Sequence, residues 1–169
     1  QQQFFQRHVK PFVTKKQRLF VIISDALRYE NGAELNRRLQ SENRYESSIE
    51  PMVSSLPSYT QLGMASLLPH KKLSFQDKSD SIVVDGMSSA GIQGRSKILA
   101  KNSGVRATAI KAEDLMKMNS AKDGRAFVKE YDLVYIYHNR IDKTGDDKTS
   151  EERVFEAVEE ELNFLMDMI

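Results

Sequence analysis

The sequence contains no cysteine, which excludes disulfide bonds and thiolate chemistry. It has no apolar run approaching the ~20 residues of a membrane-spanning helix, and its first residues lack the charged-then-apolar order of a signal peptide. Charge of one sign is not in excess either, because 25 basic and 24 acidic residues leave a net charge of +1. No global field therefore attracts nucleic acid or acidic membranes. These absences predict a soluble, cytoplasmic chain with no membrane partner.

The residues that are present are typical of a globular domain. Hydrophobic residues make up 40% of the 169 residues and charged residues 29%, enough for one domain with a real core. Residues 1–17 are expected to be an N-terminal extension and residues 18–169 an α/β domain. The last helical pattern is still apolar and periodic at Ile169, with no glycine or proline stop. We therefore expect the chain to be a fragment of a longer polypeptide.

One strand is expected to deliver a carboxylate to its carboxyl end. Residues 18–24 are almost continuously apolar, and Asp25 follows them directly. Such a run predicts a strand covered on both faces, as in a parallel sheet wrapped by helices. Ligands of such sheets bind outside the carboxyl ends of the strands. Asp25 is therefore a candidate for holding a metal or a substrate hydroxyl.

Strand and helix patterns alternate along the chain. Ser58 stands three residues before Gln61, which is the spacing of a capping box. The order of the elements predicts a doubly wound, mostly parallel sheet with helices on both faces. Strands are predicted at residues 18–24, 81–84, 105–110 and 133–137, an extended segment at 45–52, a polar connector at 71–79, and helices at 31–40, 58–68, 91–101, 113–118, 120–129 and from a cap at Thr149 to 169.

Two further segments concentrate reactive groups. Residues 54–63 place several hydroxyls at a helix start, where backbone N–H groups and the helix dipole would stabilise a Thr60 alkoxide or a phosphate. After the strand at 133–137, Asp142 and Asp146 stand four residues apart in an expected turn and could face one hard cation, with His138 nearby. Each segment alone has a structural explanation as a cap, a turn or a solvated loop. Their joint occurrence supports the functional hypothesis.

The order acid, hydroxyl, acid-x-x-Gly-acid resembles the alkaline phosphatase superfamily. In that superfamily a nucleophilic Thr, Ser or Cys at a helix start lies between an early metal-binding Asp and a later Asp-x-x-Gly-His pair. Asp25 matches the early aspartate, and Asp142 and Asp146 match the later pair, with Asp146 in the place usually held by histidine. This harder oxygen site leaves zinc, manganese and magnesium as candidate metals. Counting back from the end of the helix, as the resemblance suggests, selects Thr60 as nucleophile over Ser54, Ser55 or Ser58.

Residues 23–30, 56–68, 84–86 with 95–99, and 134–146 together resemble the PglZ domain of BREX-type bacteriophage-resistance systems. The resemblance implies a phosphatase or phosphodiesterase, a phosphate-ester substrate, and other proteins of the defence system as partners. Superfamily members complete their metal sites with a later Asp-His pair and one more His, which nothing after residue 147 can supply. We therefore expect a domain that is incomplete at its C-terminus and inactive in isolation.

Three functional hypotheses follow. In the leading one, Asp25 holds a divalent metal that touches Thr60, and Asp142 and Asp146 hold a second metal. Thr60 attacks the phosphate ester. Candidate contacts to the substrate are Arg28, Lys143 and His138. The second is a non-catalytic module that docks partner proteins. The third is a nuclease or DNA-binding domain whose basic patch comprises Lys71, Lys72, Arg95, Lys97 and Lys101.

Overall fold

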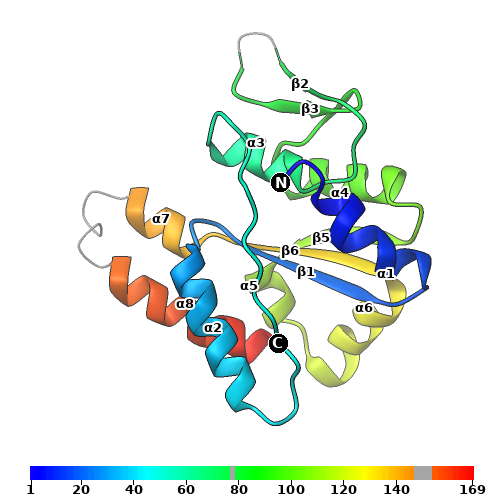
Figure 1. Ribbon diagram of the computed structural model, residues 1–169. Coiled ribbons are helices and arrows are strands. Elements are labelled where there is room, and N and C mark those ends of the chain that lie inside the picture. The colour runs from blue at the N-terminus through cyan, green and yellow to red at the C-terminus, as the bar shows by residue number, and fades with distance from the viewer. Residues whose placement is uncertain (77–78, 147–153) are drawn as a thin grey trace. The chain divides into compact units, whose positions relative to one another are not determined.

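The structure is a computed structural model that describes residues 1–76, 79–146 and 154–169 (Figure 1). The chain forms two compact units. Unit 1 comprises Gln1–Ile23 and Val53–Tyr137, and unit 2 comprises Ser24–Met52 and His138–Ile169. Two of the three crossings between the units, after Ile23 and after Tyr137, lie one residue before the end of an apolar strand.

The main sheet has three strands, β1 (Leu19–Ser24), β6 (Leu133–His138) and β5 (Ala107–Lys111), in that order. β5 and β6 are parallel, with Ala107 opposite Leu133. β6 lies between the other two, and all six of its residues are buried. The uninterrupted apolar sequence therefore corresponds to a strand covered on both faces. The α/β class and the parallel sheet confirm the predicted fold class.

The core of unit 1 lies on one face of this sheet. Alternate residues of β6, including Leu133 and Tyr135, join Val21 and Ile23 of β1 in one buried cluster. The cluster includes residues of helices α3 (Thr60–Ser66) and α4 (Gly91–Asn102), and α4 packs against β5. The hydroxyl of Tyr135 donates a hydrogen bond to the carbonyl oxygen of Leu67 at 2.9 Å, which ties the end of α3 to the sheet.

A second, antiparallel sheet contains β2 (Leu73–Phe75), β3 (Ile82–Val84) and β4 (Met87–Ser88). The connector predicted at 71–79 was therefore wrong, because β2 lies within it. The short strand predicted at 81–84 is confirmed as β3, although it belongs to an antiparallel sheet. Asp85 and Gly86 have φ values of 49° and 83°, which are typical of a two-residue turn between antiparallel strands. The Asp85 carboxylate also accepts hydrogen bonds from the backbone N–H groups of Lys71 and Lys72, which secures the hairpin.

The first residues of the chain are helical, forming η1 (Phe5–Val9) and α1 (Lys10–Thr14). Phe5 and Val9 are buried in the core of unit 1, so this segment packs on the unit. The predicted domain boundary at residue 17 falls in the loop between α1 and β1. Three short helices lie between β5 and β6, close to the predicted ranges: α5 (Ala112–Met116), η2 (Ser120–Gly124) and α6 (Arg125–Glu130).

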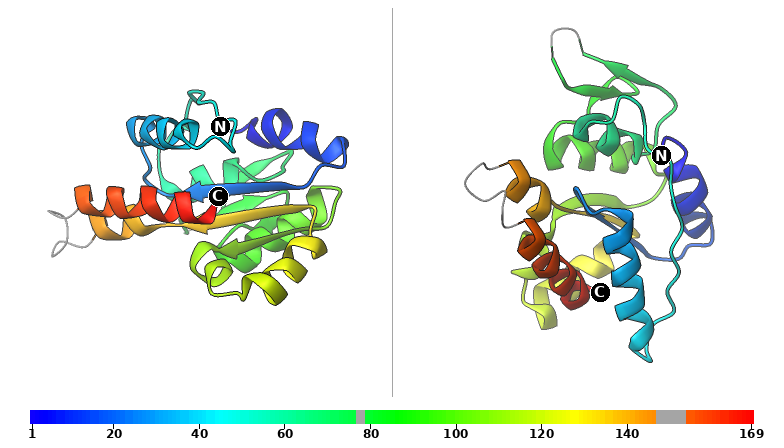
Figure 2. Two further views of the ribbon diagram at one scale, coloured as in Figure 1. Left: turned by 90° about the horizontal axis from the view of Figure 1, so that it is seen from below. Right: turned by 60° about the vertical axis from the view of Figure 1, so that its left-hand side comes forward.

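Unit 2 contains the helices α2 (Tyr29–Ser41), α7 (Arg140–Asp146) and α8 (Val154–Met168). Figure 2 shows α7 and α8 side by side, and α2 also packs against α8. Arg38 of α2 joins the helices, because its guanidinium lies 2.8 Å from both Glu34 and Glu159. The predicted cap at Thr149 lies outside the described residues. Within the described chain, no helix is long and apolar enough to cross a membrane.

Candidate functional site

Asp25 lies directly after β1 and is half-buried. Its backbone N–H donates a hydrogen bond to the carbonyl oxygen of His138, the last residue of β6, at 2.9 Å. Its Oδ1 accepts a hydrogen bond from the N–H of Ala26 at 3.1 Å. Ala26 has a φ of 62°, the left-handed conformation that non-glycine residues adopt at a cost of about 1–2 kcal/mol. The carboxylate is thus held in a tight turn at the carboxyl end of the strand, as predicted.

Asp142 and Asp146 lie on a helix, so the predicted turn was wrong. Asp142 is in the first turn of α7 and half-buried, and Asp146 is the last residue of that helix. The helix is supported by the bond from the Thr144 hydroxyl to the carbonyl oxygen of Arg140 at 2.9 Å. The side chain of Asp146 lies outside the part of the chain whose side chains the structure describes, so its proximity to Asp142 stays a prediction. Lys143 is exposed on the same helix.

Thr60 is the first residue of α3 and is exposed. The residue preceding it, Tyr59, is the N-cap and has an extended backbone without a side-chain capping bond. The predicted capping box of Ser58 and Gln61 is therefore not formed. Thr60 belongs to unit 1, whereas Asp25 and Asp142 belong to unit 2. Their convergence stays a prediction.

His138 is buried rather than open to a substrate. Its side chain is 1% exposed and stacks on the Phe164 ring, with centroids 4.4 Å apart. Nδ1 lies 2.5 Å from Oε2 of Glu161, and Oε1 of the same carboxylate accepts a hydrogen bond from the Ser24 hydroxyl at 2.5 Å. This burial does not suit direct contact between His138 and a substrate. Arg28, by contrast, is exposed directly before α2.

Sequence reasoning missed Glu161. The apolar periodicity of α8 was recognised, but Glu161 stands three residues after Val158 and four before Leu165, which places a carboxylate within the apolar face. A charged residue on the buried face of an amphipathic helix is a signal for a buried polar partner. That signal identifies the position, although not the partner.

Asp25 and Asp142 offer carboxylate oxygens, which are the type of ligand that a hard divalent cation prefers. Among the residues whose side chains are described, no group of three or more His, Cys, Asp and Glu residues could hold a metal ion. The structure therefore supports the type of ligand and leaves the predicted four-residue set a proposal.

The basic patch expected for nucleic acid is not continuous. Arg95 is 9% exposed, its Nε donates to the carbonyl oxygen of Ser89 at 3.2 Å, and its guanidinium carbon lies 4.5 Å from the centre of the Tyr137 ring. Burial raises the pKa of the Tyr137 hydroxyl above its ordinary range. Arg95 is thus part of the packing on β6, and the expectation that it belongs to an exposed patch was wrong.

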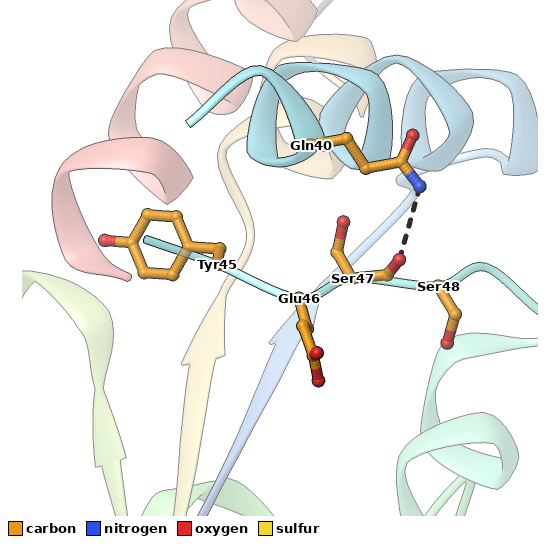
Figure 3. Close-up of a pocket in the computed structure, with 5 residues that line it drawn as sticks. All are labelled: Gln40, Tyr45, Glu46, Ser47 and Ser48. Atoms are coloured by element: carbon orange, nitrogen blue, oxygen red, sulfur yellow. Dashed lines mark hydrogen bonds between the residues drawn. The ribbon is translucent and has the colours of Figure 1, made fainter. Parts of the chain in front are cut away.

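A polar hollow of about 590 Å³ lies at the end of α2 and is lined by Gln40 and residues 45–48 (Figure 3). Nε2 of Gln40 donates a hydrogen bond across it to the carbonyl oxygen of Ser47 at 3.3 Å. None of the predicted site residues lines this hollow.

A parallel sheet with one aspartate after β1 and another in the first turn of the helix after β6 is the arrangement of an α/β domain. Ligands of such sheets generally bind outside the carboxyl ends of the strands. The chain belongs to the PglZ alkaline phosphatase-like family of BREX systems, since residues 4–169 match the family described as "BREX system PglZ alkaline phosphatase-like domain". The resemblance stated from the sequence is therefore confirmed.

Two curated relatives are similar over 100% of this chain. One is "Alkaline phosphatase-like protein BrxZ" of Escherichia coli O9:H4 (strain HS), with 43% identity. The other is "Alkaline phosphatase-like protein PglZ" of Bacillus cereus (strain H3081.97), with 40% identity. The chain spans 19% of the length of each relative. No solved structure matches it significantly.

Proposed function

We propose that this chain is part of a phosphate-ester hydrolase of the phosphatase or phosphodiesterase type. The observation that carries the proposal is the pair of carboxylates at two neighbouring strand ends, Asp25 after β1 and Asp142 after β6, in a member of an alkaline phosphatase-like family. The backbone bond from Asp25 to His138 joins those strand ends directly.

In the proposed reaction Thr60 is the nucleophile. Its exposed position at the start of α3 leaves the hydroxyl open to a phosphate ester. Its oxygen forms a bond to phosphorus while the bond from phosphorus to the leaving oxygen breaks, and the hydroxyl proton passes to solvent. Water then cleaves the phosphothreonine and restores the hydroxyl. The exposed cations Arg28 and Lys143 would bind the phosphate oxygens.

Asp25 and Thr60 would hold one divalent metal, and Asp142 and Asp146 would hold a second. Zinc, manganese and magnesium are the candidate ions. When bound, such an ion supplies positive charge that favours the Thr60 alkoxide and neutralises phosphate oxygens. We further propose that other proteins of the BREX defence system are partners of the whole protein.

The test is hydrolysis of a chromogenic phosphomonoester and phosphodiester by a full-length protein that carries this segment, with each metal supplied in turn. Thr60→Ala should abolish turnover, and Thr60→Ser should retain part of it because a hydroxyl remains. Ser58→Ala, at an exposed position two residues earlier, is the matched control and should hydrolyse like the wild type.

Wild-type turnover in the Thr60→Ala protein would exclude Thr60 as nucleophile. A full-length protein that neither binds metal nor hydrolyses either ester would favour the docking module. Cleavage confined to nucleic acid would favour the nuclease.

A further inference from the structure

Glu161 is a carboxylate buried in the middle of a helix. It is 0% exposed and lies on the face of α8 that also buries Ala157, Leu162 and Leu165. Removing an ionised carboxylate from water is unfavourable unless the group is paired and hydrogen-bonded. A leucine would fill this face without that penalty. The carboxylate must therefore provide something that apolar packing does not.

What it provides is two directional contacts from one side chain. The Ser24 hydroxyl donates to Oε1, and Nδ1 of His138 lies against Oε2, each at 2.5 Å. This assigns both oxygens of Glu161 to fixed partners. The stack of the His138 ring on Phe164 restrains the imidazole further.

Both partners are the last residues of strands that flank the candidate site. Ser24 ends β1 and directly precedes Asp25, and His138 ends β6 and accepts the backbone hydrogen bond of Asp25. Glu161 is therefore linked to Asp25 in two ways. Ser24 precedes Asp25 in the sequence, and His138 on the neighbouring strand is bonded to its backbone. All of these residues belong to unit 2.

We propose that Glu161 is a positioning residue that fixes the ends of β1 and β6 through Ser24 and His138, and so holds Asp25 in place. It does not touch the substrate, because its side chain and that of His138 are both buried. The proposal rests on the proposed function, since it assigns Asp25 to the metal site. The restraint that Glu161 places on the backbone of Asp25 can nevertheless be measured without catalysis.

The experiment compares Glu161→Gln, Glu161→Leu and the exposed control Asp167→Asn on the same helix, in a full-length protein that carries this segment. Hydrogen exchange is measured at the Asp25 amide and, as an internal reference, at the Ala109 amide of β5. Manganese affinity and the separate values of kcat and KM are measured on the same samples.

Glu161→Leu should speed exchange at Asp25 at least about tenfold relative to Ala109, and should lower metal affinity and kcat by about 10- to 100-fold, the usual effect of losing a group that orients a ligand. KM should change less. Glu161→Gln, which keeps one acceptor and the side-chain length, should be intermediate and keep the protein folded even if the leucine variant does not fold. Asp167→Asn should match the wild type.

Wild-type exchange at Asp25 in both Glu161 variants would overturn the proposal. Equal acceleration at Asp25 and Ala109 would also overturn it, because Glu161 would then stabilise the fold as a whole. If the wild-type protein proves inactive, the proposed function fails while the exchange measurement still decides the role of Glu161.

Discussion

The backbone N–H of Asp25 donates a hydrogen bond to the carbonyl oxygen of His138 at 2.9 Å. The bond joins the first residue after β1 to the last residue of β6, so the pairing of the two strands continues one residue beyond β1. Its acceptor, His138, stands four residues before Asp142 in the sequence. The bond therefore fixes the backbone of Asp25 to the end of β6, the strand that leads to Asp142.

The chain by itself should bind zinc weakly. Catalytic and structural zinc sites use three or four protein ligands, and the described side chains include no group of three that could hold a metal. Calorimetry after chelation and readdition of zinc should therefore show low affinity, and a generic phosphodiester should be hydrolysed little or not at all. Tight stoichiometric zinc in these 169 residues would mean that further groups, such as His138, complete the site.

Tyr135→Phe should destabilise unit 1. The hydroxyl of Tyr135 is buried and is bonded to the carbonyl oxygen of Leu67 at 2.9 Å, so its removal leaves a buried acceptor without that partner. We expect a loss of about 1–3 kcal/mol in the free energy of unfolding, measured by urea titration. Tyr137→Phe, two residues along the same face, is the control.

The control should cost less, because it removes a hydroxyl of equal size without losing a bond to a backbone carbonyl. Equal losses in the two variants would show that the Leu67 bond is not responsible.

Acid should destabilise helix α2. Hydrogen bonds from Arg37, and then from Arg38, lower the pKa of Glu34 from its ordinary value of 4.5 to about 2. A lowered pKa favours the ionised form in the folded state, so this stabilisation is fully present above pH 4.5 and is lost as the pH falls towards 2.

Glu34→Gln removes this titration. The difference in unfolding free energy between wild type and Glu34→Gln should therefore shrink over that pH range, as measured by urea titrations at several pH values. Glu50→Gln, at an exposed position outside the helix, should show no such trend. A difference that stays constant with pH would contradict the assigned role of Glu34.

The elements that could be predicted from sequence are those whose pattern is decided locally. β6 and α4 were predicted to within one residue at each end, because an unbroken apolar run and a long periodic helix each have few alternatives. Asp25 was placed correctly for the same reason, since it follows such a run. The β3–β4 hairpin was missed because Asp85-Gly86, a hairpin signal, was interpreted within an alternating pattern of strands and helices.

Glu161 could not be assigned a partner from sequence. Ser24 lies 137 residues away along the chain, and only the folded strand ends bring the two together. Thr60 was placed correctly at a helix start, but its capping bond was not, because local spacing does not determine which side chain reaches the free N–H groups.

The central proposal is that Asp25, Asp142 and Thr60 belong to one metal centre. The most direct test adds substoichiometric Mn²⁺ to the ¹⁵N-labelled chain and follows the broadening of each amide signal, which works well for weak, rapidly exchanging binding. The signals of Asp25, Asp142 and Thr60 should broaden together, Lys117 should stay sharp, and Asp25→Asn should abolish the effect. Broadening at Asp25 and Asp142 with an unchanged Thr60 signal would contradict the account, because the proposed nucleophile would then lie outside the metal site.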